Sequence, residues 1–266
     1  MFGIPNADSI DTVDVGYRVN GKRILEGITF SLSRGGFVGI VGPNGAGKTT
    51  LVKILVDILK PTSGKIRLAG RETSTYGRKE LFQRVAFVPQ SIDFSFPLKV
   101  LDVVLMGRMP YLGRLEIEGS KDYAIALSAL KTVGMEEFAA RVITTLSGGE
   151  KQLVALAKAI AQGTEFLVLD EPTANLDIYH QLKIMSLLRG LAHGGKGVAI
   201  VLHDLRLAAK FCTKVLVLDD GRAVNFGEPA EVLTEEAISE VFKVRVCVLR
   251  NEVDGNTIID PLEPIP

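Results

Sequence analysis

Two kinds of hydrophobic pattern alternate along the chain. Short apolar runs rich in Val and Ile are followed by stretches whose apolar residues recur at the spacing of an amphipathic helix. The clearest helical stretch is 48–59, and the strand-like runs are 37–41, 166–169, 198–202 and 215–218. This alternation predicts an α/β fold with a mainly parallel sheet.

Two regions depart from this alternation. Residues 11–34 have the pattern of short strands with a turn at Asn20-Gly21, which predicts an antiparallel β subdomain at one edge of the fold. Residues 91–160 are mostly helical in pattern, which predicts a helical subdomain inserted between two parts of a core, 1–90 and 161–227. We therefore expect residues 1–266 to form one domain with an insertion.

Residues 228–266 are predicted to be a C-terminal extension of this domain. An amphipathic helix comes first, and the strand-like segments 244–249 and 257–259 follow and are expected to pair as a small hairpin. We expect the extension to be a structural cap on the core, with a regulatory element as the alternative.

The composition excludes several classes of protein. With 266 residues, 47% of them hydrophobic, the chain is long enough to bury a substantial core. Lys plus Arg and Asp plus Glu number 31 each, so no overall charge points to nucleic acid as a partner. No apolar run reaches the roughly 18 residues of a membrane span, and residues 1–14 lack a secretory signal, so we expect a cytosolic protein. Cys212 and Cys247 fit no metal-binding pattern and are expected to be reduced and structural.

A glycine-rich loop lies between strand 37–41 and helix 48–59 and fits the pattern GxxxxGK(S/T). Its glycines let main-chain N–H groups point at phosphate oxygens, and the helix N-terminus adds its positive end. Lys48 is predicted to contact the β- and γ-phosphates of ATP, and Thr49 to ligate Mg²⁺. A chance glycine-rich turn would not bring strand, lysine, hydroxyl and helix together. The predicted nucleotide-binding residues here are Gly42, Pro43, Asn44, Gly45, Ala46, Gly47, Lys48, Thr49 and Thr50.

Two adjacent carboxylates follow the apolar strand 166–169. Asp170 ends the strand where it would face the glycine-rich loop, so we predict that it holds Mg²⁺. Glu171 comes next, and because two carboxylates this close to a metal are electrostatically coupled, we assign their roles by position in the sequence. The alternative for both is an exposed acidic turn.

A second small-residue motif, Leu146-Ser147-Gly148-Gly149-Glu150, precedes a helical pattern over 150–161. A serine-glycine helix cap would explain it if it stood alone. Its place between the glycine-rich loop and Asp170-Glu171 resembles the signature of ATP-binding cassette (ABC) ATPases. The resemblance runs from Tyr17 to at least Gly227 and implies a P-loop NTPase core, ATP and Mg²⁺ as cofactors, and ATPase activity.

The resemblance also implies a role for each motif residue. Glu171 would polarise the attacking water, His203 would contact the γ-phosphate, and Gln90 would reach Mg²⁺ or the water. Tyr17 would stack on adenine, with a buried strand tyrosine as the alternative. Lys48 counts among the catalytic residues. His180 and His193 match no motif and are expected to be surface residues of a helix.

The implied assembly is a homodimer of this chain. Ser147, Gly148 and Gly149 of one copy would close over the nucleotide of the other, and residues 175–177 would cross the interface. ATP would bridge the two copies and hydrolysis would release them.

The segment 101–113 resembles ATPases of importers for iron-siderophore, haem or cobalamin. This implies an integral membrane permease as partner, a substrate-binding protein that acts through the permease, and a peripheral location on the cytoplasmic face of the membrane. Importers of zinc or manganese and non-transport ABC ATPases stay open as alternatives. A kinase with the same loop would leave Gln90 and Ser147 to Gly149 unexplained.

Overall fold

The structure, a computed structural model, describes residues 8–90, 96–250 and 257–265. The chain divides into two compact units: unit 1 comprises Met1–Thr75 and Leu188–Pro266, and unit 2 comprises Tyr76–Leu187. Unit 2 spans more residues than the predicted helical insertion 91–160. The first residues of that insertion, 91–95, lie outside the described part. The finer division of the chain into subdomains stays a prediction.

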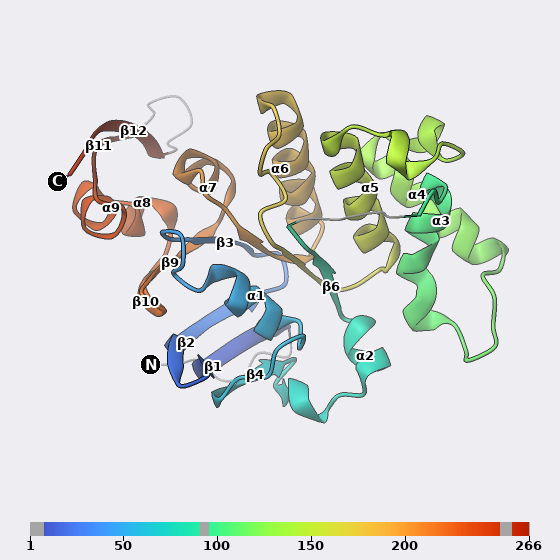
Figure 1. The fold of residues 1–266 in the computed structure, drawn as a ribbon, viewed down its shortest axis with the longest axis horizontal. Helices are drawn as coiled ribbons and strands as arrows, with labels where there is room; N and C mark the ends of the chain where they lie inside the picture. Colours follow the sequence, from blue (N-terminus) through green and yellow to red (C-terminus); the bar gives the residue numbers. More distant parts are fainter. Residues whose placement is uncertain (1–7, 91–95, 251–256, 266) are drawn as a thin grey trace. The chain divides into compact units, whose positions relative to one another are not determined.

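Unit 1 contains the antiparallel sheet expected near the N-terminus. Its hairpin turns at Asn20 and Gly21, which both have positive φ, 49° and 79°. The strands are longer than the short ones predicted, because register shifts along β1 absorb the residues that interrupt the pattern. The order in this sheet is β2-β1-β4-β5, from β1 (Ser9–Val19), β2 (Lys22–Ser33), β4 (Ser63–Leu68) and β5 (Arg71–Glu72). Figure 1 shows β2, β1 and β4 side by side.

Unit 1 also contains parallel strands. β3 (Phe37–Val41) pairs in parallel with β8 (Gly197–Val201) and with β9 (Lys214–Asp219). Every residue of β3 and β8 is buried, which explains why both are continuous apolar runs. A turn at Asp220-Gly221 then leads into β10 (Arg222–Gly227), which is antiparallel to β9.

Helix α1 (Lys48–Leu55) is shorter than predicted. The apolar pattern continues to Leu59, but Asp57 has a φ of 61° and Ile58 is 52% exposed. A left-handed residue cannot continue a right-handed helix, so the prediction was wrong at this end. Unit 1 also contains α7 (Leu205–Phe211).

The C-terminal extension has the predicted hairpin, formed by β11 (Val244–Arg250) and β12 (Thr257–Pro264). The single helix predicted before it is two helices, α8 (Pro229–Val232) and α9 (Glu235–Phe242). Helix α7 packs against β12. Cys212, at the end of α7, is buried, and burial raises the pKa of its thiol.

Unit 2 combines a parallel strand pair with a group of helices. β6 (Val85–Val88) pairs with β7 (Phe166–Leu169), and α3, α4 and α5 pack on one another, as the green ribbons in Figure 1 show. Pro110 lies within a 3₁₀ helix over Met106–Tyr111. The helices are α2 (Arg78–Phe82), α3 (Val100–Leu105), α4 (Ser120–Val133), α5 (Gly148–Ala161) and α6 (Ile178–His193), with 3₁₀ turns at Glu136–Phe138 and Ile143–Thr145, while a further 3₁₀ turn at Thr73–Thr75 belongs to unit 1.

Helix α6 continues across the boundary into unit 1. Among the described residues, none of the helices has the length and apolar content needed to cross a bilayer.

Candidate active site

In unit 1, the glycine-rich loop connects β3 to α1 with a backbone that glycine alone accommodates at two points. Gly42 has a φ of 154°, and a Cβ there would lie 2.2 Å from the carbonyl oxygen of Leu218. Gly47 has a φ of 94°, and a Cβ there would lie 2.6 Å from the side chain of Leu25. The loop is therefore packed closely against its own unit, while Asn44 and Gly45 are exposed.

The Lys48 side chain holds this loop together. It is 4% exposed, and its Nζ donates hydrogen bonds of 2.8 Å to the carbonyl oxygens of Gly42 and Pro43. Lys48, Thr49 and Thr50 form the first turn of α1, and Thr49 and Thr50 are half-buried. The predicted phosphate-binding residues thus lie at a helix N-terminus, where partial positive charge favours an anion.

His203 and Tyr17 also belong to unit 1. β3 and β8 run in parallel with Ile40 opposite Val201, and the N–H of Leu202 donates to the Ile40 carbonyl at 3.1 Å. His203 therefore leaves the same edge of the sheet as the glycine-rich loop, and it is exposed. Tyr17 is half-buried on β1 opposite Leu25, the residue that contacts Gly47.

In unit 2, the parallel pairing of β6 with β7 brings Gln90 and Glu171 together. The N–H of Asp170 donates to the Val88 carbonyl at 2.9 Å, which extends the ladder to the end of both strands. Gln90 Nε2 then donates to Glu171 Oε2 at 2.5 Å. Asp170 is 2% exposed, and Glu171 has a φ of 47°, a strained conformation typical of functional turns.

The signature motif forms the start of α5. The helix begins at Gly148, two residues before the predicted start at Glu150, because Ser147 caps it. Ser147 Oγ accepts from the Glu150 N–H at 3.3 Å, while Glu150 Oε2 accepts from the Ser147 N–H and hydroxyl at 2.8 Å each. These two donors hold the pKa of the Glu150 carboxyl below its usual range. The S-x-x-E pattern of this capping box is visible in the sequence.

Sequence reasoning missed one close contact, which involves His180. It lies on α6 as expected, but its ring packs against Gly149 and its Nδ1 lies 2.9 Å from Asp177 Oδ1. The main-chain N–H of His180, with the ring, lowers the pKa of the Asp177 carboxyl. Asn175, in the same loop, has a φ of 58°. The available signal was the spacing of Asp177 and His180, a helix-capping distance.

The three predicted Mg²⁺ ligands have suitable chemistry. Thr49 offers a hydroxyl, Gln90 an amide oxygen that its bond to Glu171 leaves available, and Asp170 a buried carboxylate. In phosphate sites Mg²⁺ is held by one or two carboxylates together with phosphate oxygens, so the ligand type that each of these residues offers suits this ion. Thr49 belongs to unit 1, and Gln90 and Asp170 belong to unit 2.

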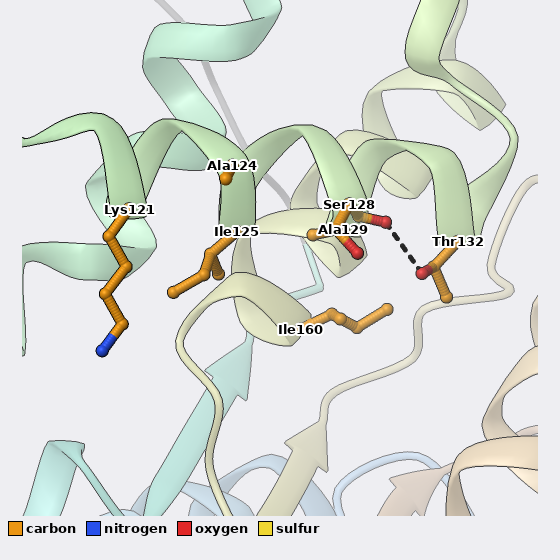
Figure 2. A pocket seen from close by; sticks show the side chains of 7 residues that line it. All are labelled: Lys121, Ala124, Ile125, Ser128, Ala129, Thr132 and Ile160. Carbon is orange, nitrogen blue, oxygen red and sulfur yellow. Dashed lines mark hydrogen bonds between the residues drawn. The ribbon is translucent and has the colours of Figure 1, made fainter.

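A hollow of about 370 Å³ lies elsewhere in unit 2, between α4 and the end of α5 (Figure 2). Within it the Thr132 hydroxyl donates to the main-chain carbonyl of Ser128 at 2.9 Å, an ordinary bond within a helix. None of the predicted site residues lines this hollow, which is formed by Lys121, Ala124, Ile125, Ser128, Ala129, Thr132 and Ile160.

Known proteins are similar in sequence to this chain over nearly its whole length. The family described as ABC transporter matches residues 25–174. A cobalamin import ATP-binding protein of Halobacterium salinarum is 39% identical over 255 residues, which are 96% of this chain and 64% of that protein. A hemin import ATP-binding protein of Gloeobacter violaceus is 39% identical over 93% of this chain and 92% of its own length. The chain therefore spans less than two thirds of the halobacterial relative.

Solved structures of ABC transporter proteins are also similar to this chain. An inward-facing ABC transporter of metal-chelate type has a TM-score of 0.84 and 29% identity, over 96% of this chain and 97% of that chain. A dimeric bacterial ABC transporter cassette has a TM-score of 0.71 and 30% identity, over 83% of this chain and 98% of that chain. The predicted fold class is confirmed by these likenesses.

Proposed function

Because the chain belongs to the ABC transporter family, we propose that it hydrolyses ATP as a subunit of a membrane importer for metal chelates. The observation that carries the catalytic part is the 2.5 Å bond from Gln90 to Glu171, beside the buried Asp170. Gln90, Asp170 and Glu171, the three predicted groups of unit 2, lie at the carboxyl ends of the paired strands β6 and β7.

In this proposal, residues of both units act on one nucleotide. Lys48 and Thr50 bind its phosphates, and His203 contacts the γ-phosphate. Glu171 orients a water molecule and accepts its proton as the water oxygen bonds to the γ-phosphorus and the bond to the ADP oxygen breaks. Mg²⁺, held by Thr49, Asp170 and Gln90, would neutralise charge on the phosphate oxygens.

We further propose that the active form is a homodimer, with Ser147, Gly148 and Gly149 of the second copy completing each site. A dimeric cassette with 30% identity supports this. The exposed position of Ser147 and Gly148 at the start of α5 also suits contact with a second copy.

The cargo is proposed from two sources, the names of relatives and the 101–113 segment. Relatives 39% identical are named for import of cobalamin and of hemin. After this segment, Leu115 and Ile117 are 98% and 83% exposed, and Met109 within it is 63% exposed, which suits docking on a permease. The subunit would then lie at the cytoplasmic face of the membrane, and a substrate-binding protein would deliver the chelate to the permease.

The catalytic proposal is tested with Glu171→Gln. The amide cannot accept the proton of the attacking water, so phosphate release should fall by roughly 10²-fold or more, while ATP stays bound and holds the dimer together. Phosphate release and gel filtration with ATP measure both effects. Glu165→Gln changes a half-exposed carboxylate immediately before β7; it is the matched control and should behave like the parent. Unchanged turnover with no dimer would remove Glu171 from this role.

The transport proposal is tested by copurification. The tagged subunit should recover an integral membrane permease from detergent extracts, and addition of the permease with its loaded binding protein should raise ATP turnover. Recovery of the subunit without a membrane protein would favour a non-transport ABC ATPase. Stimulation by zinc or manganese in place of a chelate would favour the free-metal importers.

A further inference from the structure

His180 binds the Asp177 carboxylate through two donors. Its main-chain N–H donates to Asp177 Oδ1 at 2.8 Å, and its Nδ1 lies 2.9 and 3.0 Å from the two carboxylate oxygens. Because an ionised carboxylate only accepts hydrogen bonds, the proton of a neutral His180 ring is assigned to Nδ1. The 175–177 loop is thus fixed at its last residue by the side chain and the main chain of one histidine.

The other side of the same ring lies on the signature. A Cβ at Gly149 would be 2.9 Å from His180 Cδ2, closer than real Cβ atoms come, and 3.0 Å from Cγ. Glycine at this position is therefore what lets the imidazole reach the start of α5. The ring of Tyr179 meets the imidazole edge-on with centroids 5.2 Å apart, and the His180 side chain is only 26% exposed.

We infer that His180 is a positioning residue, which fixes the 175–177 loop and the Ser147–Gly149 turn as one rigid surface presented to the second copy. This inference rests on the proposed function, in which both segments act across the homodimer interface. The imidazole joins them through two separable contacts: a hydrogen bond to Asp177 and ring packing on Gly149. Neither segment binds nucleotide in its own copy under that proposal, so ATP affinity of the monomer should not depend on His180.

Two substitutions separate the contacts. His180→Phe keeps a ring over Gly149 and removes the donor to Asp177. His180→Asn keeps a donor near the position of Nδ1 and removes most of the ring, while His180→Ala removes both. The matched control is His193→Ala, which removes the exposed histidine at the other end of the same helix.

The experiment uses the full chain with Glu171→Gln, and measures dimerisation against ATP concentration by gel filtration with light scattering. For His180→Ala, the ATP concentration for half-maximal dimer should rise about tenfold, which corresponds to about 1.4 kcal/mol. His180→Phe and His180→Asn should each give a smaller rise. ATP binding by the monomer, measured with a fluorescent ATP analogue below the dimerising concentration, should stay within about twofold of the parent, and this also verifies that each variant is folded.

The inference is overturned if all three His180 variants dimerise at the same ATP concentration as the His193→Ala control. It is also overturned if monomer ATP affinity falls in step with dimerisation, because His180 would then act on the fold and not on the interface. Failure of the Glu171→Gln parent itself to dimerise is a different result, since it removes the proposed homodimer together with the inference that rests on it.

Discussion

At the scale of single residues, the buried Arg108 contacts three different partners. It is 8% exposed, its Nε donates to Asp122 at 2.9 Å, its Nη1 donates to the Ala161 carbonyl at 2.9 Å, and its guanidinium lies 4.0 Å from the ring centre of Tyr111. The planar fork of arginine reaches these three partners from one position. One side chain therefore ties the 3₁₀ segment to the start of α4 and the end of α5.

Arg108→Lys should consequently destabilise the chain. An ammonium cannot serve both hydrogen-bond partners and the aromatic face, so the Ala161 carbonyl loses its donor, at a cost of about 1–3 kcal/mol in free energy of unfolding. Urea unfolding measures the difference. The control is Arg141→Lys, because that exposed guanidinium lies over Phe138 and should change stability by less than about 0.5 kcal/mol. Equal losses for both variants would contradict the argument.

The position of a residue in the fold could be predicted from the sequence where that residue belongs to a fixed local motif. Lys48 and Asp170 follow strands that the apolar runs locate, and their burial agrees with their predicted places. His180 was not predictable in the same way. Its contact with Gly149 joins segments that are distant in the chain, and a single histidine in a helical pattern gives no sign of which glycine it will meet.

At the scale of elements, the strands buried on both faces were located almost to the residue. The errors lie where backbone conformation overrides the hydrophobic pattern. Asp57 ends α1 by adopting positive φ although apolar residues continue at helical spacing. Asp14, also at positive φ, lies within a strand that register shifts keep continuous. Periodicity reports which side chains can be buried and contains no information about such single dihedral angles.

The capping box of α5 predicts a specific dependence of stability on pH. The Ser147 N–H and hydroxyl hold the pKa of Glu150 below its ordinary value of 4.5, with smaller contributions from Arg141 and His180. A lowered pKa in the folded state means that the carboxylate stabilises the fold above about pH 4.5, and that this stabilisation is lost as pH falls through the folded-state pKa. The same charge also suits the positive end of the helix.

Glu150→Gln keeps an oxygen acceptor for the cap and removes the titration. The parent should therefore be more stable than Glu150→Gln near pH 7, and the difference should shrink as the pH is lowered below about 4.5. Urea unfolding at a series of pH values from 7 to about 3 measures it. A difference that stays constant over this range would show that the lowered pKa of Glu150 contributes nothing to folding.

At the scale of the whole molecule, the proposed catalytic groups are divided between the two units. Lys48 and His203 belong to unit 1, whereas Gln90, Asp170 and Glu171 belong to unit 2. A ligand that contacts both units must stabilise both, by an amount that follows from its affinity and concentration. Binding to unit 1 alone would leave the stability of unit 2 unchanged.

ADP with Mg²⁺ should therefore slow hydrogen exchange in both units, at residues 42–50 in one and near residues 88–90 and 170–171 in the other. At about 100 times the dissociation constant the linkage amounts to about 2.7 kcal/mol, enough to measure by exchange mass spectrometry. Lys48→Ala should abolish the protection in both units, because the phosphates lose the buried ammonium that organises the loop. Lys60→Ala, which removes an exposed lysine paired with Asp57, should retain it. Protection confined to residues 42–50 would mean that Asp170 and Gln90 do not share the nucleotide with Lys48, and their assignment to one active site would fail.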